Sequence, residues 1–542
     1  MSRKVLVVSM LTLMLLVACQ LITLPLLTPK ASPTIENSPI PKASPVPSAS
    51  PSPSPEPSPT VPPPSQTPVE RHEALSPFSI GWDDRQPFAS GLIDSQQVVL
   101  GQLEGASIYH MDLFIADEPV QISGTLEVRY TNQEHEPLDE VDFRLYPNLF
   151  GGEASVENVV VEGTRVEPGL EGLGSVMRLP LPESIQPGDQ IVIGFDFIVD
   201  IPANMSGNYG LFSYFDGVLA LNEFYPVVAT YDDQGWSREV PSLQGDVSYY
   251  DASFYLVRVS APASLVLVTS GVEVDRVIHE GRQSVTFAAG PIRNFYMVGS
   301  ERYVIESSTL GEIRVNSYAY QEYERGAEQS LIYIEGALRS FSDRFAPYPY
   351  TEFDVVSIPM YALGMEYPGI VAIFDDLYDP GKILYGMEAW DLMENVIAHE
   401  VGHQWFYNLV GSDQINEPWL DEAFAQFLTS LYYLDIYGPD ADWNYRQGWE
   451  GRWNSVGRAD IPIGMPVADY EGGEYSAIVY GRGPIFVKAL QAEMGEQIFA
   501  DFLCDYVETY AWALATTEDF RQLAEAHCGC DLSALFEAWV YP

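Results

Sequence analysis

The chain has 542 residues, 46% of them hydrophobic and 13% aromatic, which is enough for two or three domains with sizeable cores. Asp and Glu number 76 against 27 Lys and Arg, giving a formal net charge of −49. Such a surface repels nucleic acid and anionic lipid head groups, so a nucleic-acid-binding function is excluded. The same surface attracts cations, including the free amines of peptides, although a plain solvated acidic surface is the simpler interpretation.

The N-terminus has the organisation of an export signal. Arg3 and Lys4 precede the apolar run Val5–Val17, which is too short to span a bilayer comfortably. The run ends in Leu-Val-Ala-Cys at residues 16–19, which resembles a bacterial lipobox. We therefore predict a signal peptide over residues 1–18, a lipid anchor on Cys19 and a position at the bacterial cell surface. A secretory signal with an incidental cysteine is the alternative.

Residues 19–77 are predicted to form a lipid-anchored spacer. From about residue 24 this stretch is rich in proline and serine, as in "SPVPSASPSPSPEPSP". Proline at this density cannot build a packed core, and it favours an extended, semi-rigid chain that rises about 3 Å per residue. The spacer would hold the folded part away from the membrane.

Residues 78–303 are predicted to form an antiparallel β domain, either a sandwich or a saddle. The runs at 120–132 and 190–202 alternate apolar and polar residues, and 252–271 reads as two strands around a turn. Glycine, proline and asparagine separate these runs at intervals typical of strands.

Residues 304–542 are predicted to form a separate α+β domain, so the whole is a multidomain α+β protein. Strand-like runs at 312–320 and 352–359 enclose a helical pattern at 323–346, and helices dominate from residue 387 to the end. Cys504, Cys528 and Cys530 fall in this part. A disulfide from Cys504 to one of the other two and free buried thiols remain alternatives, and a metal site at His527, Cys528 and Cys530 lacks enough ligands.

The stretch "AHEVGHQWFYNLVG" at 398–411 carries the strongest chemical pattern. His399 and His403 lie one helical turn apart on the same face, so both imidazoles can reach one zinc ion, and Glu400 would stand beside the metal as a general base. The apolar spacing continues to Val410, so we predict a helix that ends at Gly411.

A catalytic zinc site needs a third protein ligand and one open position. Glu422 follows His403 by 19 residues, in the pattern of a second helix at 416–434. A helix, a turn and a returning helix can bring this carboxylate to the metal.

These motifs resemble those of the gluzincin zinc aminopeptidases of the aminopeptidase N family. The resemblance rests on "HEVGH" with Glu422 in "WLDEAFA", on "ALGMEYPGI" at 362–370 and on "EYSAIVYGRGPIFV" at 474–487, and it extends over most of residues 100–542. It implies a thermolysin-like catalytic domain after the β domain, one zinc ion per chain, and peptide substrates with a free N-terminus.

The resemblance also implies a role for each matching residue. His399, His403 and Glu422 would hold zinc, with Glu400 as the general base and Tyr480 as the donor to the oxyanion. Glu366 would bind the substrate α-amine, and Tyr475 would be a second tyrosine of the substrate site.

Four departures from the family pattern stand out. Tyr367 replaces the usual asparagine after Glu366, so we expect a different rim at the first subsite, and Arg482 replaces a lysine. The family's second amine-binding glutamate has no clear equivalent, with Asp216 and Glu223 as weak candidates. The large C-terminal helical domain of many relatives is expected to be absent, which would leave an open cleft.

The sequence thus predicts a lipid-anchored zinc aminopeptidase that trims extracellular peptides. The alternatives are an endopeptidase on the same scaffold and a catalytically weak peptide-binding or structural lipoprotein. The full set of Glu366, Glu400 and Tyr480 argues against a decayed enzyme. An epoxide hydrolase activity, known from one family branch, would need the C-terminal domain.

Overall fold

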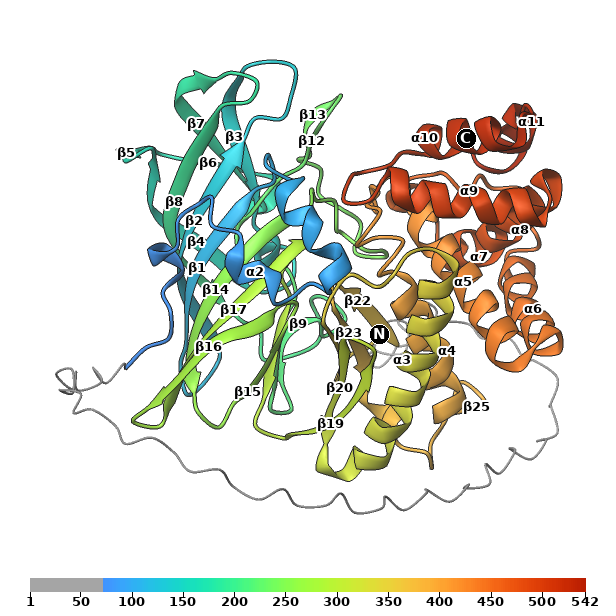
Figure 1. Cartoon of the computed structure of the whole chain (residues 1–542), viewed down its shortest axis with the longest axis horizontal. Helices are drawn as coiled ribbons and strands as arrows, with labels where there is room; N and C mark the ends of the chain where they lie inside the picture. The colour runs from blue at the N-terminus through green and yellow to red at the C-terminus, as the bar shows by residue number, and fades with distance from the viewer. Residues whose placement is uncertain (1–71) are drawn as a thin grey trace, which may run out of the picture. The chain divides into compact units, whose positions relative to one another are not determined.

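A computed structural model describes residues 72–542 (Figure 1). Cys19 and nearly all of the predicted spacer lie outside the described residues, so the lipid anchor stays a prediction. His72–Pro542 belong to one unit by their internal contacts, and the domain limits at 77/78 and 303/304 stay predictions as well. Among residues 72–542, no helix combines the length and apolar character that a membrane crossing requires.

The part of the chain before Tyr303 is rich in strands. Its largest sheet has eight strands, which in sheet order are β16 (Val272–His279), β17 (Arg282–Ile292), β14 (Ser253–Pro262), β1 (Ile108–Ile115), β2 (Gln121–Thr131), β8 (Gln190–Asp200), β4 (Glu153–Val161) and β5 (Thr164–Arg165). All neighbours are antiparallel except β1 and β14, which run parallel. A long stretch of chain separates these two strands, so it can return in the same direction.

Two four-stranded sheets and a hairpin complete this part. One sheet contains β15 (Val266–Thr269), β18 (Met297–Ser300), β10 (Val218–Leu221) and β9 (Phe212–Phe215). The other contains β11 (Val227–Val228), β3 (Leu138–Arg144), β7 (Val176–Ile185) and β6 (Gly169–Glu171). The hairpin joins β12 (Tyr231–Asp232) to β13 (Gly235–Trp236).

The alternating runs are confirmed as strands. The pattern at 120–132 is β2, the pattern at 190–202 is β8, and the two strands pair with each other. The double run at 252–271 forms β14 and β15. Burial follows the alternation at most positions of β8, where apolar side chains enter the core and charged ones stay outside, as in a sheet with one covered face.

A five-stranded sheet begins the part of the chain that follows the β-rich part. Its order is β19 (Tyr303–Leu310), β20 (Ile313–Tyr320), β21 (Glu352–Ile358), β23 (Ile370–Phe374) and β22 (Gly364–Tyr367). β20, β21 and β23 are parallel, and the edge strand β22 is antiparallel to β23. Helix α3 (Glu324–Arg344) connects the parallel strands β20 and β21, as parallel pairing requires a crossover. A two-stranded hairpin follows, with β24 (Ile383–Leu384) and β25 (Met387–Glu388).

The rest of the chain is helical, as predicted, apart from short connecting segments (Figure 1, orange to red). Its helices are α4 (Ala389–Gly402), α5 (Trp419–Tyr437), α6 (Pro439–Ser455), α7 (Glu474–Ala477), α8 (Gly483–Met494), α9 (Glu496–Thr509), α10 (Thr517–Cys528) and α11 (Ser533–Trp539). A short helix near the N-terminal end of the described chain is α2 (Gln86–Ala89). The fold is therefore a β-rich domain followed by a mixed α/β domain with a helical C-terminal part.

The prediction of one helix over 398–411 is wrong beyond His403. Helix α4 ends at Gly402 with His403 as its cap, and Tyr407 has a φ of 132° that no helix contains. The Tyr407 amide donates to the Val410 carbonyl, which closes a turn instead. The apolar residues of this turn are spaced as in a helix but enter the core from an irregular backbone, which a periodicity argument cannot detect.

The side chain of Arg293 donates hydrogen bonds to the backbone carbonyls of that turn. Its guanidinium is 2% exposed and donates to Asn408 and Leu409 in the turn, to Tyr250 in the β-rich part and to Ala513 before α10, at distances of 2.7–3.2 Å. One side chain thus satisfies four carbonyls from three segments and fixes the end of α4 against both neighbours.

Neither predicted alternative describes all three cysteines, because only Cys504 is a free thiol. Cys528 and Cys530 form a disulfide with each other, so a bond from Cys504 to either is wrong, and neither can join His527 in a metal site. Cys504 is a free thiol whose Sγ donates to the Arg344 carbonyl at 3.0 Å. The thiol therefore faces the end of α3 and not the α10–α11 connection.

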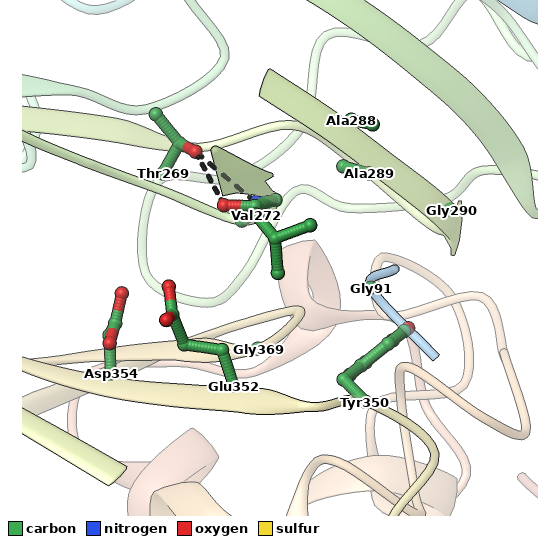
Figure 2. Close-up of a pocket in the computed structure, with 12 residues that line it drawn as sticks. Gly91, Thr269, Val272, Ala288, Ala289, Gly290, Tyr350, Glu352, Asp354 and Gly369 are labelled. Atoms are coloured by element: carbon green, nitrogen blue, oxygen red, sulfur yellow. Dashed lines mark hydrogen bonds between the residues drawn. The ribbon is translucent and has the colours of Figure 1, made fainter. Parts of the chain in front are cut away.

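A small cavity lies where the β-rich part meets the five-stranded sheet (Figure 2). Glu352 and Asp354 of β21 present their carboxylates to it, opposite Thr269 at the end of β15. Asn316 donates to Asp354 at 2.8 Å, and burial raises the pKa of Asp354 well above its usual range. The lining contains neither histidine nor cysteine, so this cavity is not the predicted metal site.

Candidate metal centre and active site

Helix α4 brings the two histidines of the motif together. The Nε2 atoms of His399 and His403 are 3.4 Å apart, and the ring planes are nearly perpendicular. His403 caps the helix with φ −64° and ψ −13°, so the spacing of one turn is kept although the helix ends there. Both rings are buried. The i, i+4 spacing therefore has the geometric result expected from the sequence.

Glu422 on α5 completes a group of three possible ligands. Its Oε2 lies 3.1 Å from Nε2 of His399 and 3.8 Å from Nε2 of His403. Ligands at 2.0–2.1 Å from a tetrahedral zinc are separated by about 3.3 Å, so the three measured separations bracket the required value. Two imidazoles and one carboxylate are also a donor set of catalytic zinc sites. The residues present fit zinc in both geometry and chemistry, and they leave the fourth position to water or substrate.

Asp421 orients the second histidine. Its Oδ1 makes a short contact with Nδ1 of His403, which also lies 3.2 Å from the Phe406 carbonyl. A proton on Nδ1 satisfies these acceptors and leaves the lone pair of Nε2 free for a metal. The other oxygen of Asp421 accepts from Gln414. Asp421 and Glu422 are consecutive on α5, so one helical turn supplies a ligand and the support of another ligand.

Glu400 lies against the edge strand of the catalytic sheet. A Cβ added to Gly364 of β22 would come within 2.2 Å of Oε1 of Glu400, so only glycine allows the carboxylate to take this position. Burial raises the pKa of Glu400 well above its usual range, and the nearby Glu366 and Glu422 carboxylates add to the rise. A carboxylate in this environment has a raised proton affinity, as a general base requires.

Glu366 also lies on β22 and is held by two glutamines. Gln414 donates to Oε1 of Glu366 at 3.0 Å, and burial raises the pKa of Glu366 to about 7. Gln404, just after α4, donates to the Tyr367 carbonyl at 3.0 Å and accepts from the Gly369 amide at 2.9 Å. The β22–β23 hairpin is thereby fixed to the end of the histidine helix, which sets the position of Glu366 relative to the metal ligands.

Tyr475 on α7 and Tyr480 in the turn after it lie beside the proposed metal ligands. Tyr480 is in a π-helical turn, Ile478–Arg482, which breaks the register between α7 and α8. Its hydroxyl is within hydrogen-bonding reach of Glu422, and its ring lies 6.0 Å from that of His399. π-helical turns often mark functional positions. Tyr475 is buried and packs against Tyr480, with the ring centroids 5.7 Å apart.

The departures from the family pattern have structural explanations. Tyr367 is buried and stacks on Tyr296 with ring centroids 3.6 Å apart, so it fills the core instead of shaping an exposed rim. Arg482 pairs with Asp460 at 2.6 Å and donates to the Ala538 carbonyl at 2.9 Å, so it ties the π-helical turn to α11.

The two weak candidates for a second amine-binding acid differ in their surroundings. Glu223 is buried and accepts from Tyr250 at 2.9 Å and Asn294 at 2.7 Å. Burial raises the pKa of Glu223 to about 7. Asp216 pairs with Arg302 at the surface. Glu223 is therefore the better placed of the two.

Sequence reasoning missed three polar residues of the site: Asp421, Gln414 and Asp246. Asp421 could have been found, because an acidic residue beside a metal ligand is a frequent support of histidine. Gln414 and Asp246 lie in irregular segments without any motif. Asp246 contacts Glu422 and is close to Glu366, although it belongs to the β-rich part of the chain.

The chain is similar in sequence to known peptidases. Residues 333–539 match the family model described as the Peptidase family M1 domain. Aminopeptidase M1-B of Oryza sativa subsp. japonica is 27% identical over 440 residues, which cover 73% of this chain and 49% of the relative. Aminopeptidase 2 of Candida albicans is 23% identical over 448 residues, which cover 78% and 47%. This chain thus spans about half the length of these curated relatives.

Solved structures show the same fold. An M1 zinc metallopeptidase from Deinococcus radiodurans superposes with a TM-score of 0.59 at 19% identity, covering 80% of this chain and 92% of the other. A mutant of that protein bound to a Tyr-Ser-Ala substrate gives a TM-score of 0.58 at 20% identity, covering 81% and 94%.

Replacing Asp421 by Asn should weaken zinc binding without removing a ligand. The variant keeps the shape of the side chain but loses the charge that holds Nδ1–H of His403, so we expect the zinc dissociation constant to rise about 10- to 100-fold. Competition with a metal-binding dye measures this constant. Asp233→Asn, at an exposed hairpin, is the matched control and should bind zinc like the parent. Equal affinity in the Asp421 and Asp233 variants would contradict the supporting role.

Proposed function

We propose that this chain is a zinc-dependent metallopeptidase of the M1 family that removes N-terminal residues from peptides. The observation that carries the proposal is the convergence of His399, His403 and Glu422 on one point, with Glu400 beside it. The M1 match over residues 333–539 and the aminopeptidase relatives support the same assignment.

Zinc, when bound by these three residues, polarises the scissile carbonyl and lowers the pKa of a water molecule. Glu400 accepts the proton of the attacking water on its carboxylate and returns it to the nitrogen of the leaving amine. The Tyr480 hydroxyl donates to the oxygen of the tetrahedral intermediate, and a donor of this kind is worth about 10²- to 10³-fold in rate.

Glu366 supplies the preference for the chain terminus. Its buried carboxylate lies on the edge strand near Glu400, and Gln414 is the side chain among the described residues that donates to it. An α-ammonium group would form a charge-assisted hydrogen bond there and would place the first peptide bond near Glu400. An internal segment of a peptide has no such group, so it lacks this contact.

Glu400→Gln should retain zinc and lose turnover. The amide has the size of the carboxylate but cannot accept the proton of water, so we expect kcat to fall by about 10²- to 10⁴-fold. Hydrolysis of aminoacyl-coumarin amides measures the rate, and atomic absorption measures zinc content. Glu388→Gln, exposed just before the same helix, is the control and should keep full activity. In the parent, a chelator should abolish hydrolysis and added zinc should restore it; undiminished activity of Glu400→Gln would overturn the assignment.

Peptides with a free N-terminus should be cleaved at least about 10²-fold better than their acetylated forms, because acetylation leaves the buried Glu366 without a cation. The measurement compares kcat/KM for one peptide in both forms, with the products identified by mass spectrometry. Glu366→Gln should lose most of this preference. Equal cleavage of both forms by the parent would show an endopeptidase, which is the alternative on this scaffold.

We also propose that the enzyme acts outside the cytoplasm, attached through Cys19. The charged start, the short apolar run and the Leu-Val-Ala-Cys sequence at residues 16–19 support this placement. In a bacterial host, Cys19→Ser should move the protein from the membrane fraction to the soluble fraction on immunoblots. The same partition for parent and variant would rule out an anchor at this residue.

A further inference from the structure

The disulfide between Cys528 and Cys530 takes no part in the proposed hydrolysis. Cys528 is the last residue of α10, Gly529 follows it in the left-handed region with a φ of 60°, and Cys530 comes next. Cys530 is exposed and Cys528 is half-buried. The bond therefore lies at the surface, where a reagent in solution can reach one of its two sulfur atoms.

This bond does little to hold the fold together. The stability that a disulfide adds grows with the length of the chain segment that it closes, and this one encloses a single residue. Other contacts already fix the connection from α10 to α11. The Glu525 carboxylate accepts from the Leu532 amide at 2.9 Å and from Arg521 at 2.8 Å. The Gly529 amide donates to the Glu525 carbonyl at 2.9 Å. We therefore expect the local structure to persist when the bond opens.

The two sulfur atoms are suited to different roles in an exchange reaction. Sγ of Cys530 is on the exposed residue, so an incoming thiolate reaches it first and the electron pair of the broken bond stays on Cys528. The Cys530 amide donates to Sγ of Cys528 at 3.2 Å, and such a donor stabilises a leaving thiolate. After protonation, the Cys528 thiol can donate to the Glu525 carbonyl, which lies 3.6 Å from its sulfur.

Acidic groups around the bond determine which thiols can approach it. Asp531 follows Cys530 and is exposed. Hydrogen bonds from Ser533 hold the pKa of Asp531 below its usual range, so this carboxylate is ionised at neutral pH. Arg521 does not offset it, because its guanidinium is paired with Glu525 at 2.8 Å. Together with the net charge of −49, these groups repel anionic thiols and admit neutral or cationic ones.

We propose that Cys528 and Cys530 form a thiol–disulfide exchange site for neutral or cationic thiols of low molecular weight. The thiolate of one such molecule attacks Sγ of Cys530, the S–S bond breaks, and Cys528 leaves as a thiolate that takes a proton from water. A second thiolate attacks the mixed disulfide on Cys530, which releases the Cys530 thiolate and the small molecule as its own disulfide. Two thiols are oxidised and one disulfide is reduced, so the electrons balance. This proposal does not depend on the proposed peptidase function.

The test counts thiols in the folded chain. The background carries Cys19→Ser and Cys504→Ser, so that only the exchange pair can be alkylated. Without denaturant, millimolar dithiothreitol should open the bond within minutes, and mass spectrometry should then find two iodoacetamide labels per chain, against none before reduction. Near-UV circular dichroism and the Tm should stay as in the oxidised protein. Labels that appear only after denaturation, or loss of the near-UV signal on opening, would show a structural bond and overturn the proposal.

Two comparisons test the steps and the selection by charge. Cystamine should reoxidise the reduced pair without leaving an adduct, whereas a Cys528→Ser variant should keep one cysteamine on Cys530, because the resolving thiol is missing. A lasting adduct on the intact pair would overturn the exchange. Glutathione and its diethyl ester carry the same thiol and differ in charge, so at low ionic strength the ester should open the bond at least about threefold faster. Equal rates would overturn the selection by charge. None of these measurements uses peptide hydrolysis, so their outcome is independent of the proposed function.

Discussion

Negative charge buried around two imidazoles is the constraint on which this site depends. A buried ion without a partner costs several kcal/mol, and here carboxylates from β22, α4, α5 and the segment before β14 converge on one point. Among the described residues, Asp421 contacts His403 and Glu422 contacts His399, and no lysine or arginine pairs with these two carboxylates. Under the proposed function, a divalent ion and the α-ammonium group of a peptide would balance the remaining charge. The arrangement of the carboxylates therefore favours the binding of cations.

The scaffold keeps these carboxylates in place with neutral donors and close backbone approaches. Gln414 bridges Glu366 and Asp421, and Gln404 fixes the β22–β23 hairpin to the end of α4. Arg293 is the buried cation beside the turn that follows α4 in the described chain. Its guanidinium donates to the carbonyl oxygens of Asn408 and Leu409 and not to the carboxylates of the site. Glycine at Gly364 lets Glu400 lie directly on the edge strand. Neutral amide groups can hold the carboxylates in position without balancing their negative charge. The site therefore still favours the binding of a cation.

The sequence predicted what depends on local periodicity and missed what depends on irregular backbone. The strands β2 and β8, the helix α3 and the pair His399 and His403 follow from spacing alone. The helix expected up to Gly411 stops at Gly402, because an apolar spacing of three and four residues fits a core-facing turn equally well. The parallel pairing of β1 with β14 and the Cys528–Cys530 bond depend on how distant or adjacent segments meet, for which a pattern gives no signal. Gln414 and Asp246 lie outside any periodic element, so their place in the site could not be read.

The residues that could be predicted lie close together in the sequence, and those that were missed or less certain come from distant segments. The proposed metal ligands and the proposed general base lie within 24 consecutive residues, at the end of α4 and on α5, and local geometry fixes much of their relation. The residues proposed to face the substrate come from separate elements: Glu366 from the edge strand β22 and Tyr480 from a π-helical turn. Their positions relative to the histidines depend on how these elements pack together. A short sequence motif is therefore enough to predict the type of reaction. Substrate selectivity depends on how distant segments pack together and cannot be predicted from one motif.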